Sequence, residues 1–200
     1  MSGTRNRTPA TRLPPEARRE QLIGIGLELL REHSLDELST DEVAQRAGIS
    51  RGLLFHYFAN KQDFYRAVVQ VECDRFLAAL AVPRDTAPTA EGPGFRELIG
   101  AFVDYVLANR ALYLALVRGA SGSHPAVTDI VEATRTRAAE WLTQAVRRDG
   151  RAPLPHQEIL SRAWMAFAEE ATTSWPPGGP EAQAELTEFL ETSFQRLIDP

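Results

Sequence analysis

Apolar side chains recur at helical spacing along almost the whole chain. Within residues 15–31, for example, Leu22, Ile23, Leu27 and Leu30 fall on one face of an α-helix. No stretch alternates apolar and polar positions over more than a few residues, so we expect no β-sheet. The sequence therefore predicts an all-α fold of about nine helices, at residues 15–31, 40–47, 51–57, 61–82, 95–108, 110–120, 125–148, 156–173 and 181–198.

Proline and glycine interrupt this helical pattern at a few places. The clearest break is residues 83–94, PRDTAPTAEGPG, which hold three prolines and two glycines. Residues 1–14 are polar, contain two prolines and lack acidic side chains, so we expect a flexible arm there. The rest divides into an N-terminal domain, residues 15–62, and a helical bundle, residues 63–200. The long helix at 61–82 would belong to both.

Residues 38–64 contain the most specific local signals of the chain. Ser39 is a favourable N-cap, and Glu42 three positions later completes an S-x-x-E capping box. Gly48 supplies the left-handed residue that closes this first short helix, and Ser50 caps a second one. Two short helices joined by a three- or four-residue turn are typical of a helix-turn-helix motif.

The start of the second helix suits entry into the major groove of DNA. Ser50, Arg51 and Gly52 are small or polar, as close approach to base edges requires. Asn60 is placed to cap the next helix, whose N-terminal N–H groups would attract a phosphate together with Lys61. The turn alone would equally suit a tight corner in an all-helical protein.

Residues 47–61, AGISRGLLFHYFANK, closely resemble the N-terminal DNA-binding domain of TetR-type (tetracycline-repressor-like, TetR/AcrR) transcriptional regulators. The resemblance covers roughly residues 18–71. It implies contacts to the DNA backbone from Thr40, Tyr57 and Lys61. It also implies contacts to base edges from Arg51 and Gly52, with Leu53 and His56 as further candidates.

Two positions depart from the family pattern. Phe55 stands where tyrosine is usual, and a phenyl ring cannot donate the hydrogen bond to phosphate that a phenol donates. Ser34 stands where glycine commonly ends the first helix. The candidate DNA-binding residues, including the capping serines, are Ser39, Thr40, Ser50, Arg51, Gly52, Leu53, Phe55, His56, Tyr57 and Lys61.

The resemblance also implies a homodimer. The helices at 156–173 and 181–198 carry wide apolar stripes, with Trp164 and Phe167 on the first and Phe189 on the second, that suit a four-helix bundle made with a second copy. Packing of both helices within a monomer is the alternative. A two-fold dimer would hold paired recognition helices about one DNA turn apart, so the expected partner is double-stranded DNA with a palindromic operator.

The central helices carry aromatic residues that suit either a ligand pocket or an ordinary core. The resemblance implies that an unknown small-molecule effector binds among them and moves the DNA-binding domains through the helix at 61–82. Polar candidates for such a pocket are His124, His156, Glu169 and Glu170, each of which also fits a solvated or capping position. The aromatic candidates are Phe102, Tyr105, Tyr113, Trp141, Trp164 and Phe167.

Charge and composition narrow the possibilities further. Residues 1–70 hold ten basic and nine acidic side chains and the remainder hold twelve and eighteen, so the net charge of −5 comes from the second part. The longest apolar runs, such as residues 111–117, are too short to span a membrane, and no secretory signal is present, so we expect a cytoplasmic protein without a membrane partner. Cys73 is the only cysteine, which excludes an intramolecular disulfide.

The sequence contains no catalytic or cofactor motif. Metal-ligand spacing, a phosphate-binding glycine loop and a nucleophile with a partner base are all missing, so we expect no enzyme, cofactor or metal. The best interpretation is a DNA-binding transcriptional regulator, a repressor released from its operator when a small molecule binds the C-terminal domain. The alternative is a helical protein-interaction module whose helix-turn-helix no longer reads DNA.

Overall fold

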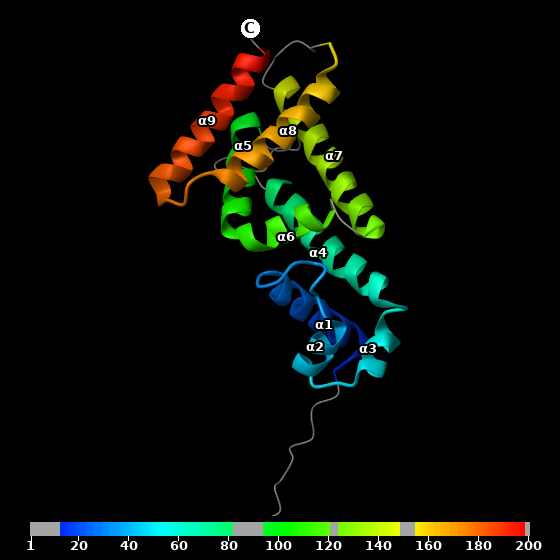
Figure 1. Ribbon diagram of the computed structural model, residues 1–200. Coiled ribbons are helices and arrows are strands. Elements are labelled where there is room, and N and C mark those ends of the chain that lie inside the picture. Colours follow the sequence, from blue (N-terminus) through cyan, green and yellow to red (C-terminus); the bar gives the residue numbers. More distant parts are fainter. Residues whose placement is uncertain (1–12, 82–93, 121–123, 149–154, 199–200) are drawn as a thin grey trace, which may run out of the picture.

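The computed structural model describes residues 13–81, 94–120, 124–148 and 155–198. Within these ranges every regular element is a helix, which confirms the predicted all-α fold (Figure 1). The helices are α1 (Pro15–Leu30), α2 (Thr40–Arg46), α3 (Arg51–Tyr57), α4 (Lys61–Ala81), α5 (Phe95–Ala108), α6 (Arg110–Ala120), α7 (Pro125–Arg148), α8 (Gln157–Ser174) and α9 (Pro180–Ile198).

Serine side chains begin the two helices of the helix-turn-helix motif. Ser39 Oγ accepts a hydrogen bond from the backbone N–H of Glu42 at 3.4 Å, and Ser50 Oγ accepts one from a backbone N–H of α3 at 3.2 Å. Gly48 has a φ of 67° and ends α2 in the left-handed conformation, as predicted. The Glu42 carboxylate differs from the predicted capping box, because it pairs with Arg46 at 2.8 Å.

The first core joins α1, α2 and α3 to the N-terminal part of α4 and to buried residues of α6 and α7. Leu54, Phe58 and Phe64 are at most 1% exposed within it. A Cβ on Gly26 would lie 2.8 Å from Cγ2 of Val68, so α1 approaches α4 closely because position 26 has no side chain. The helix-turn-helix motif is therefore packed firmly onto α4.

Tyr65 in α4 ties the same unit together. Its ring is fully buried, and its phenol O–H donates a hydrogen bond to the backbone C=O of Leu38, directly before α2. The Lys61 ammonium lies 5.1 Å from the ring centroid, and His124 meets the ring edge-on at 5.4 Å. Tyr65 thus fixes the segment between α1 and α2 to the long helix.

Replacing Tyr65 with phenylalanine should lower the free energy of unfolding by about 1–3 kcal/mol, because the Leu38 carbonyl loses a donor in a buried place. Denaturant titration followed by circular dichroism measures this change. Tyr57→Phe removes the same atom from a partly buried ring on α3 and should change stability by less than about 0.5 kcal/mol. Equal losses in the two variants would show that the Tyr65 hydroxyl makes no special contribution.

A second core fills the C-terminal part of the molecule. The end of α4 packs with α5, α7, α8 and α9 around Phe76 and Leu142. Phe95 stacks on Phe194 at 4.8 Å between centroids, and Phe194 meets Trp164 edge-on at 5.0 Å, so α5, α8 and α9 share one aromatic cluster. Helices α8 and α9 lie at the end of the molecule away from α1, α2 and α3 (Figure 1).

None of the helices in the described ranges is long and apolar enough to span a membrane by itself. Helices α5 and α6 reach the necessary length and composition only when they are joined, and they are bent by 93° relative to each other.

Candidate functional site

Helix α3 presents small and polar residues to solvent. Leu54 on its inner side is fully buried, whereas Leu53 is 40% exposed. This contrast fixes which side of the seven-residue helix faces outward. The exposed candidates at its N-terminal end and on its outer side are Ser50, Arg51, Gly52, Leu53 and His56.

Phe55 and Tyr57 border this surface and are partly buried. Phe55 packs against the first core, and the Arg51 guanidinium lies 5.6 Å from its ring centroid. Tyr57 meets His56 edge-on at 5.5 Å. The Phe55 ring therefore supports Arg51 by contact, where a tyrosine would add a hydroxyl.

Arg51 also makes an ion pair that the sequence pattern did not indicate. Its Nη1 lies 3.1 Å from Oδ2 of Asp41 in the first turn of α2. Both side chains are well exposed, so this pair contributes little to stability. Arg51 can therefore leave Asp41 for another acceptor at a small cost in free energy.

Lys61 opens α4 directly after the helix-turn-helix motif. Asn60 Oδ1 accepts a hydrogen bond from the backbone N–H of Asp63 at 2.9 Å, so Asn60 caps α4 as predicted. The Lys61 side chain is exposed at this end. The remaining N–H groups of the first turn and the ammonium suit a phosphate, while the Asp63 carboxylate in the same turn accepts a hydrogen bond from the backbone N–H of Ala59.

Ser39 and Thr40 lie at the start of α2. The Ser39 hydroxyl is engaged by the backbone N–H of Glu42, and Thr40 is only 4% exposed. Ser39 therefore caps α2, and only a small part of the Thr40 surface is open to solvent.

A small cavity of about 40 Å³ lies among α4, α5, α6, α7 and α8. Tyr105 and Tyr113, two of the aromatic candidates, line it. Among the polar candidates, Glu169 lines the cavity, Glu170 is exposed, and His156 directly precedes α8. Apolar walls with a few polar groups are typical of small-molecule sites.

The other aromatic candidates lie elsewhere. Phe102 and Trp164 are at most 4% exposed and belong to the second core. Trp141 is partly buried, with the Arg137 guanidinium 5.8 Å from its ring centroid. Phe167 is 41% exposed on α8. Aromatic residues of the same helical spacing lie in the core, at the cavity and on the surface. Their spacing therefore could not predict which of them line the cavity.

Two central polar groups of the cavity, Glu72 and Arg135, were not among the sequence candidates. Glu72 is 4% exposed and accepts a 2.7 Å hydrogen bond from the Tyr105 phenol. Burial, together with this bond to Glu72, raises the pKa of Tyr105, which keeps the phenol protonated as a donor. Arg135 donates two hydrogen bonds to Glu169, at 3.0 and 2.9 Å. The position of Glu72 in the sequence could have identified it as buried, because it falls one turn before Phe76 on the buried face of α4.

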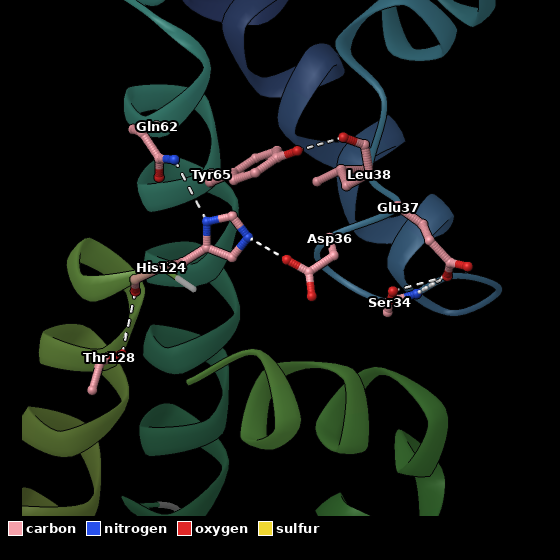
Figure 2. Close-up of polar contacts among 8 residues, drawn as sticks. All are labelled: Ser34, Asp36, Glu37, Leu38, Gln62, Tyr65, His124 and Thr128. Carbon is pink, nitrogen blue, oxygen red and sulfur yellow. Dashed lines mark hydrogen bonds and ion pairs between the residues drawn. The ribbon is translucent and has the colours of Figure 1, made fainter. Parts of the chain in front are cut away.

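His124, directly before α7, connects the C-terminal helices to the segment between α1 and α2 (Figure 2). Its Nε2 lies 2.9 Å from Oδ1 of Asp36, between α1 and α2, and its Nδ1 lies 3.5 Å from Nε2 of Gln62 in α4. Its backbone C=O accepts a hydrogen bond from the Thr128 hydroxyl in α7. His124 does not line the cavity. It lies instead where α7 meets the unit formed by α1, α2, α3 and the start of α4, which we call the DNA-binding unit.

Models of one protein family match both parts of the chain. Residues 22–68 match the model described as "Bacterial regulatory proteins, tetR family". Residues 94–197 match the model described as "Tetracyclin repressor-like, C-terminal domain". The second match alone covers more than half of the 200 residues.

Individual proteins from several bacteria are similar to this chain. The transcriptional activator FasR of Mycolicibacterium smegmatis is 23% identical over 164 residues, which cover 82% of this chain and 74% of FasR. RutR of Escherichia coli is 24% identical over 152 residues, covering 75% of this chain and 72% of RutR. A TetR-family regulator from Streptomyces coelicolor has a similar structure with a TM-score of 0.72 and 32% identity, covering 92% of this chain and 82% of that one. Salmonella enterica GusR shares the fold, with a TM-score of 0.69 at 16% identity over 96% of this chain and all of GusR.

These matches agree with the geometry of α2 and α3 and favour a DNA reader over a protein-interaction module. The matched family consists of transcriptional regulators and not of enzymes. The chain therefore belongs to the TetR family of bacterial transcriptional regulators, with an N-terminal helix-turn-helix that binds DNA and a C-terminal TetR-like helical domain.

Proposed function

We propose that two copies of this chain form a repressor that leaves a palindromic operator when a small molecule binds in the cavity. The observation that carries this proposal is the position of α4. Its first residue, Lys61, directly follows the helix-turn-helix motif, and its residues Glu72, Cys73 and Phe76 line the cavity. One helix of 21 residues thus links the DNA-binding unit to the ligand site.

In this proposal residues 15–62 bind DNA, and residues 63–200 bind the effector and dimerise. Helix α3 enters the major groove, where Arg51, Gly52, Leu53 and His56 meet base edges. Tyr57 and Lys61 contact phosphates beside it. The predicted arm at residues 1–14 lies, except for its last two residues, outside the described ranges.

Lys61→Ala should weaken operator binding several-fold and lower the slope of log K against log salt by about 0.9, the value for one phosphate contact. Fluorescence anisotropy at a series of salt concentrations measures both quantities. Arg118→Ala removes an exposed positive charge from α6 and should leave the slope unchanged. If Lys61→Ala also keeps the native slope, Lys61 is not a phosphate contact.

An exposed apolar stripe on α8 and α9 supports the dimer. Ile159 and Phe167 on α8 are 68% and 41% exposed, and Phe189 and Leu197 on α9 are 42% and 48% exposed. The rings of Phe167 and Phe189 lie 5.8 Å apart, so the two helices contribute to one surface. A second copy related by two-fold symmetry would bury this stripe.

The effector acts in this scheme through unequal affinity for two conformations. A ligand shifts an equilibrium only as far as it prefers one state, so an inducer must bind the DNA-free form more tightly. Because Gly26 packs against Val68 and Tyr65 bonds to Leu38, a displacement of α4 would carry α3 with it. His124 provides a second connection, from α7 to the segment between α1 and α2 (Figure 2).

His124→Ala should raise amide hydrogen exchange in residues 31–38, because the contact that holds Asp36 against α7 is lost. Hydrogen exchange followed by mass spectrometry measures the change. His33→Ala removes an exposed imidazole from the same segment and should leave exchange as in the native chain. Unchanged exchange in His124→Ala would mean that this contact does not restrain the DNA-binding unit.

A promoter fusion tests the direction of regulation. Loss of the gene should raise expression of a reporter placed behind the protein's own operator. FasR, one of the similar proteins, is named as an activator. A fall in reporter expression would therefore assign activation to this chain.

A further inference from the structure

Three aromatic rings from three helices line the cavity. Phe76 comes from α4, Tyr105 from α5 and Tyr113 from α6. The Phe76 centroid lies 5.4 Å from that of Tyr105 and 6.0 Å from that of Tyr113, with the ring planes inclined by 72° and 49°. The rings therefore meet at angles instead of forming a stack. Ring faces carry partial negative charge, so a wall of this kind attracts cations.

A buried carboxylate lies in the same wall. Glu72 is 4% exposed, and its Oε1 accepts the hydrogen bond from the neutral Tyr105 phenol. Its ion-pair partner Arg75 is mostly exposed and lies 3.8 Å from Oε2. This ion pair is long and its Arg75 side faces solvent, so Glu72 can attract a second cation from the cavity side.

The guanidinium in the cavity is already engaged. Arg135 donates two hydrogen bonds to Glu169 and a third, at 2.6 Å, to Glu132. A ligand carboxylate would have to displace one of these partners. The lining side chains carry two carboxylates, Glu72 and Glu169, and one guanidinium, that of Arg135, which leaves one net negative charge. The cavity therefore favours a cation over an anion.

We propose that this cavity binds a compact organic cation, an ammonium group with a few alkyl carbons, held against Glu72 and the three aromatic rings. The alkyl carbons would contact Leu116, Val117 and Val131 on the apolar side. The enclosed space of about 40 Å³ restricts the ligand to a small one. The claim that this cation releases DNA rests on the proposed function, whereas its binding requires only the cavity.

Three molecules of nearly the same shape and different charge test the proposal: tetramethylammonium, tert-butyl alcohol and pivalate. Each is titrated at constant ionic strength into the protein without DNA, and binding is followed by ligand-observed NMR. The cation should bind at least about tenfold more tightly than the other two. Tighter binding of pivalate, equal binding of all three or no binding of any would overturn the proposal.

Cys73 gives a second measurement, because it lines the cavity and is the only cysteine. Burial raises the pKa of its thiol, so its reaction with a thiol reagent should be slow in the folded protein. Bound tetramethylammonium should slow the reaction further. An equal effect of pivalate at the same concentration would contradict selection by charge.

Glu72→Gln keeps the size of the side chain and an acceptor for Tyr105 but removes the charge, so affinity for tetramethylammonium should fall about tenfold. Asp74→Asn makes the same change at an exposed position of α4 and should leave binding unaltered. Circular dichroism checks that each variant folds. If Glu72→Gln does not fold, Phe76→Leu takes its place and should show a similar loss. Native affinity in whichever folded variant is used would overturn the proposal.

A separate experiment with operator DNA distinguishes the two proposals. If tetramethylammonium binds the protein selectively but leaves the DNA complex intact, the cation site stands and release by this ligand fails. If another small molecule releases the DNA while tetramethylammonium does not bind, the cation site fails and the proposed function stands.

Discussion

A variant carrying Phe167→Glu and Phe189→Glu should be monomeric and should bind the operator at least about a hundredfold more weakly than the native chain. The two rings lie 5.8 Å apart on the exposed stripe of α8 and α9. In a two-fold dimer the substitutions would bury four carboxylates close together without positive partners, which opposes association. A monomer holds one reading helix, so it loses the gain in affinity that comes from binding both half-sites at once.

Sedimentation velocity measures the mass of this variant, and fluorescence anisotropy measures its affinity for the operator. Ala108→Glu with Ala111→Glu adds the same two charges at exposed positions at the end of α5 and the start of α6 and should leave both values unchanged. A dimer of native affinity in the double phenylalanine variant would place the interface on another surface.

Phe64→Ala should lower the free energy of unfolding by about 3–5 kcal/mol. The Phe64 ring is fully buried and meets Phe58 edge-on at 5.0 Å. A Cβ built on Gly26 would lie 2.9 Å from Cζ of Phe64, so the ring fills the place where α1 and α4 approach each other. Its removal would leave a hole there, and the surrounding helices would close it only in part.

Urea titration followed by circular dichroism measures this loss. Leu53→Ala, at an exposed position of α3, serves as the control and should cost less than about 1 kcal/mol. A similarly small loss for Phe64→Ala would show that the first core can rearrange around position 64.

The positions of the helices could be predicted because their ends are determined locally. Ser39, Ser50 and Asn60 each accept a hydrogen bond that begins a helix, and Gly48 takes the left-handed conformation that ends one. One of the small differences in helix bounds also has a local cause. Helix α9 begins one residue earlier than predicted, at Pro180, because proline is tolerated in the first turn of a helix.

Contacts between distant segments could not be predicted in the same way. Asp36 and His124 are 88 positions apart, and Glu72 and Tyr105 are 33 apart. Helical periodicity identifies the buried face of α4, but it does not say which of those positions faces a core and which a cavity. A carboxylate on a buried face, such as Glu72, was a further sequence signal for the cavity beside the candidates Tyr105, Tyr113 and Glu169. The outward position of Phe167 depends on the packing of α8 against α7 and α9.

The most direct test of the whole account is binding of the purified protein to DNA flanking its own gene, measured by fluorescence anisotropy across a salt series. We expect tight, sequence-selective binding of two protomers per site, with a log–log salt slope of about −0.9 for each phosphate contacted. Weak binding that is the same for every DNA sequence would contradict the assignment of α3 as the reading helix.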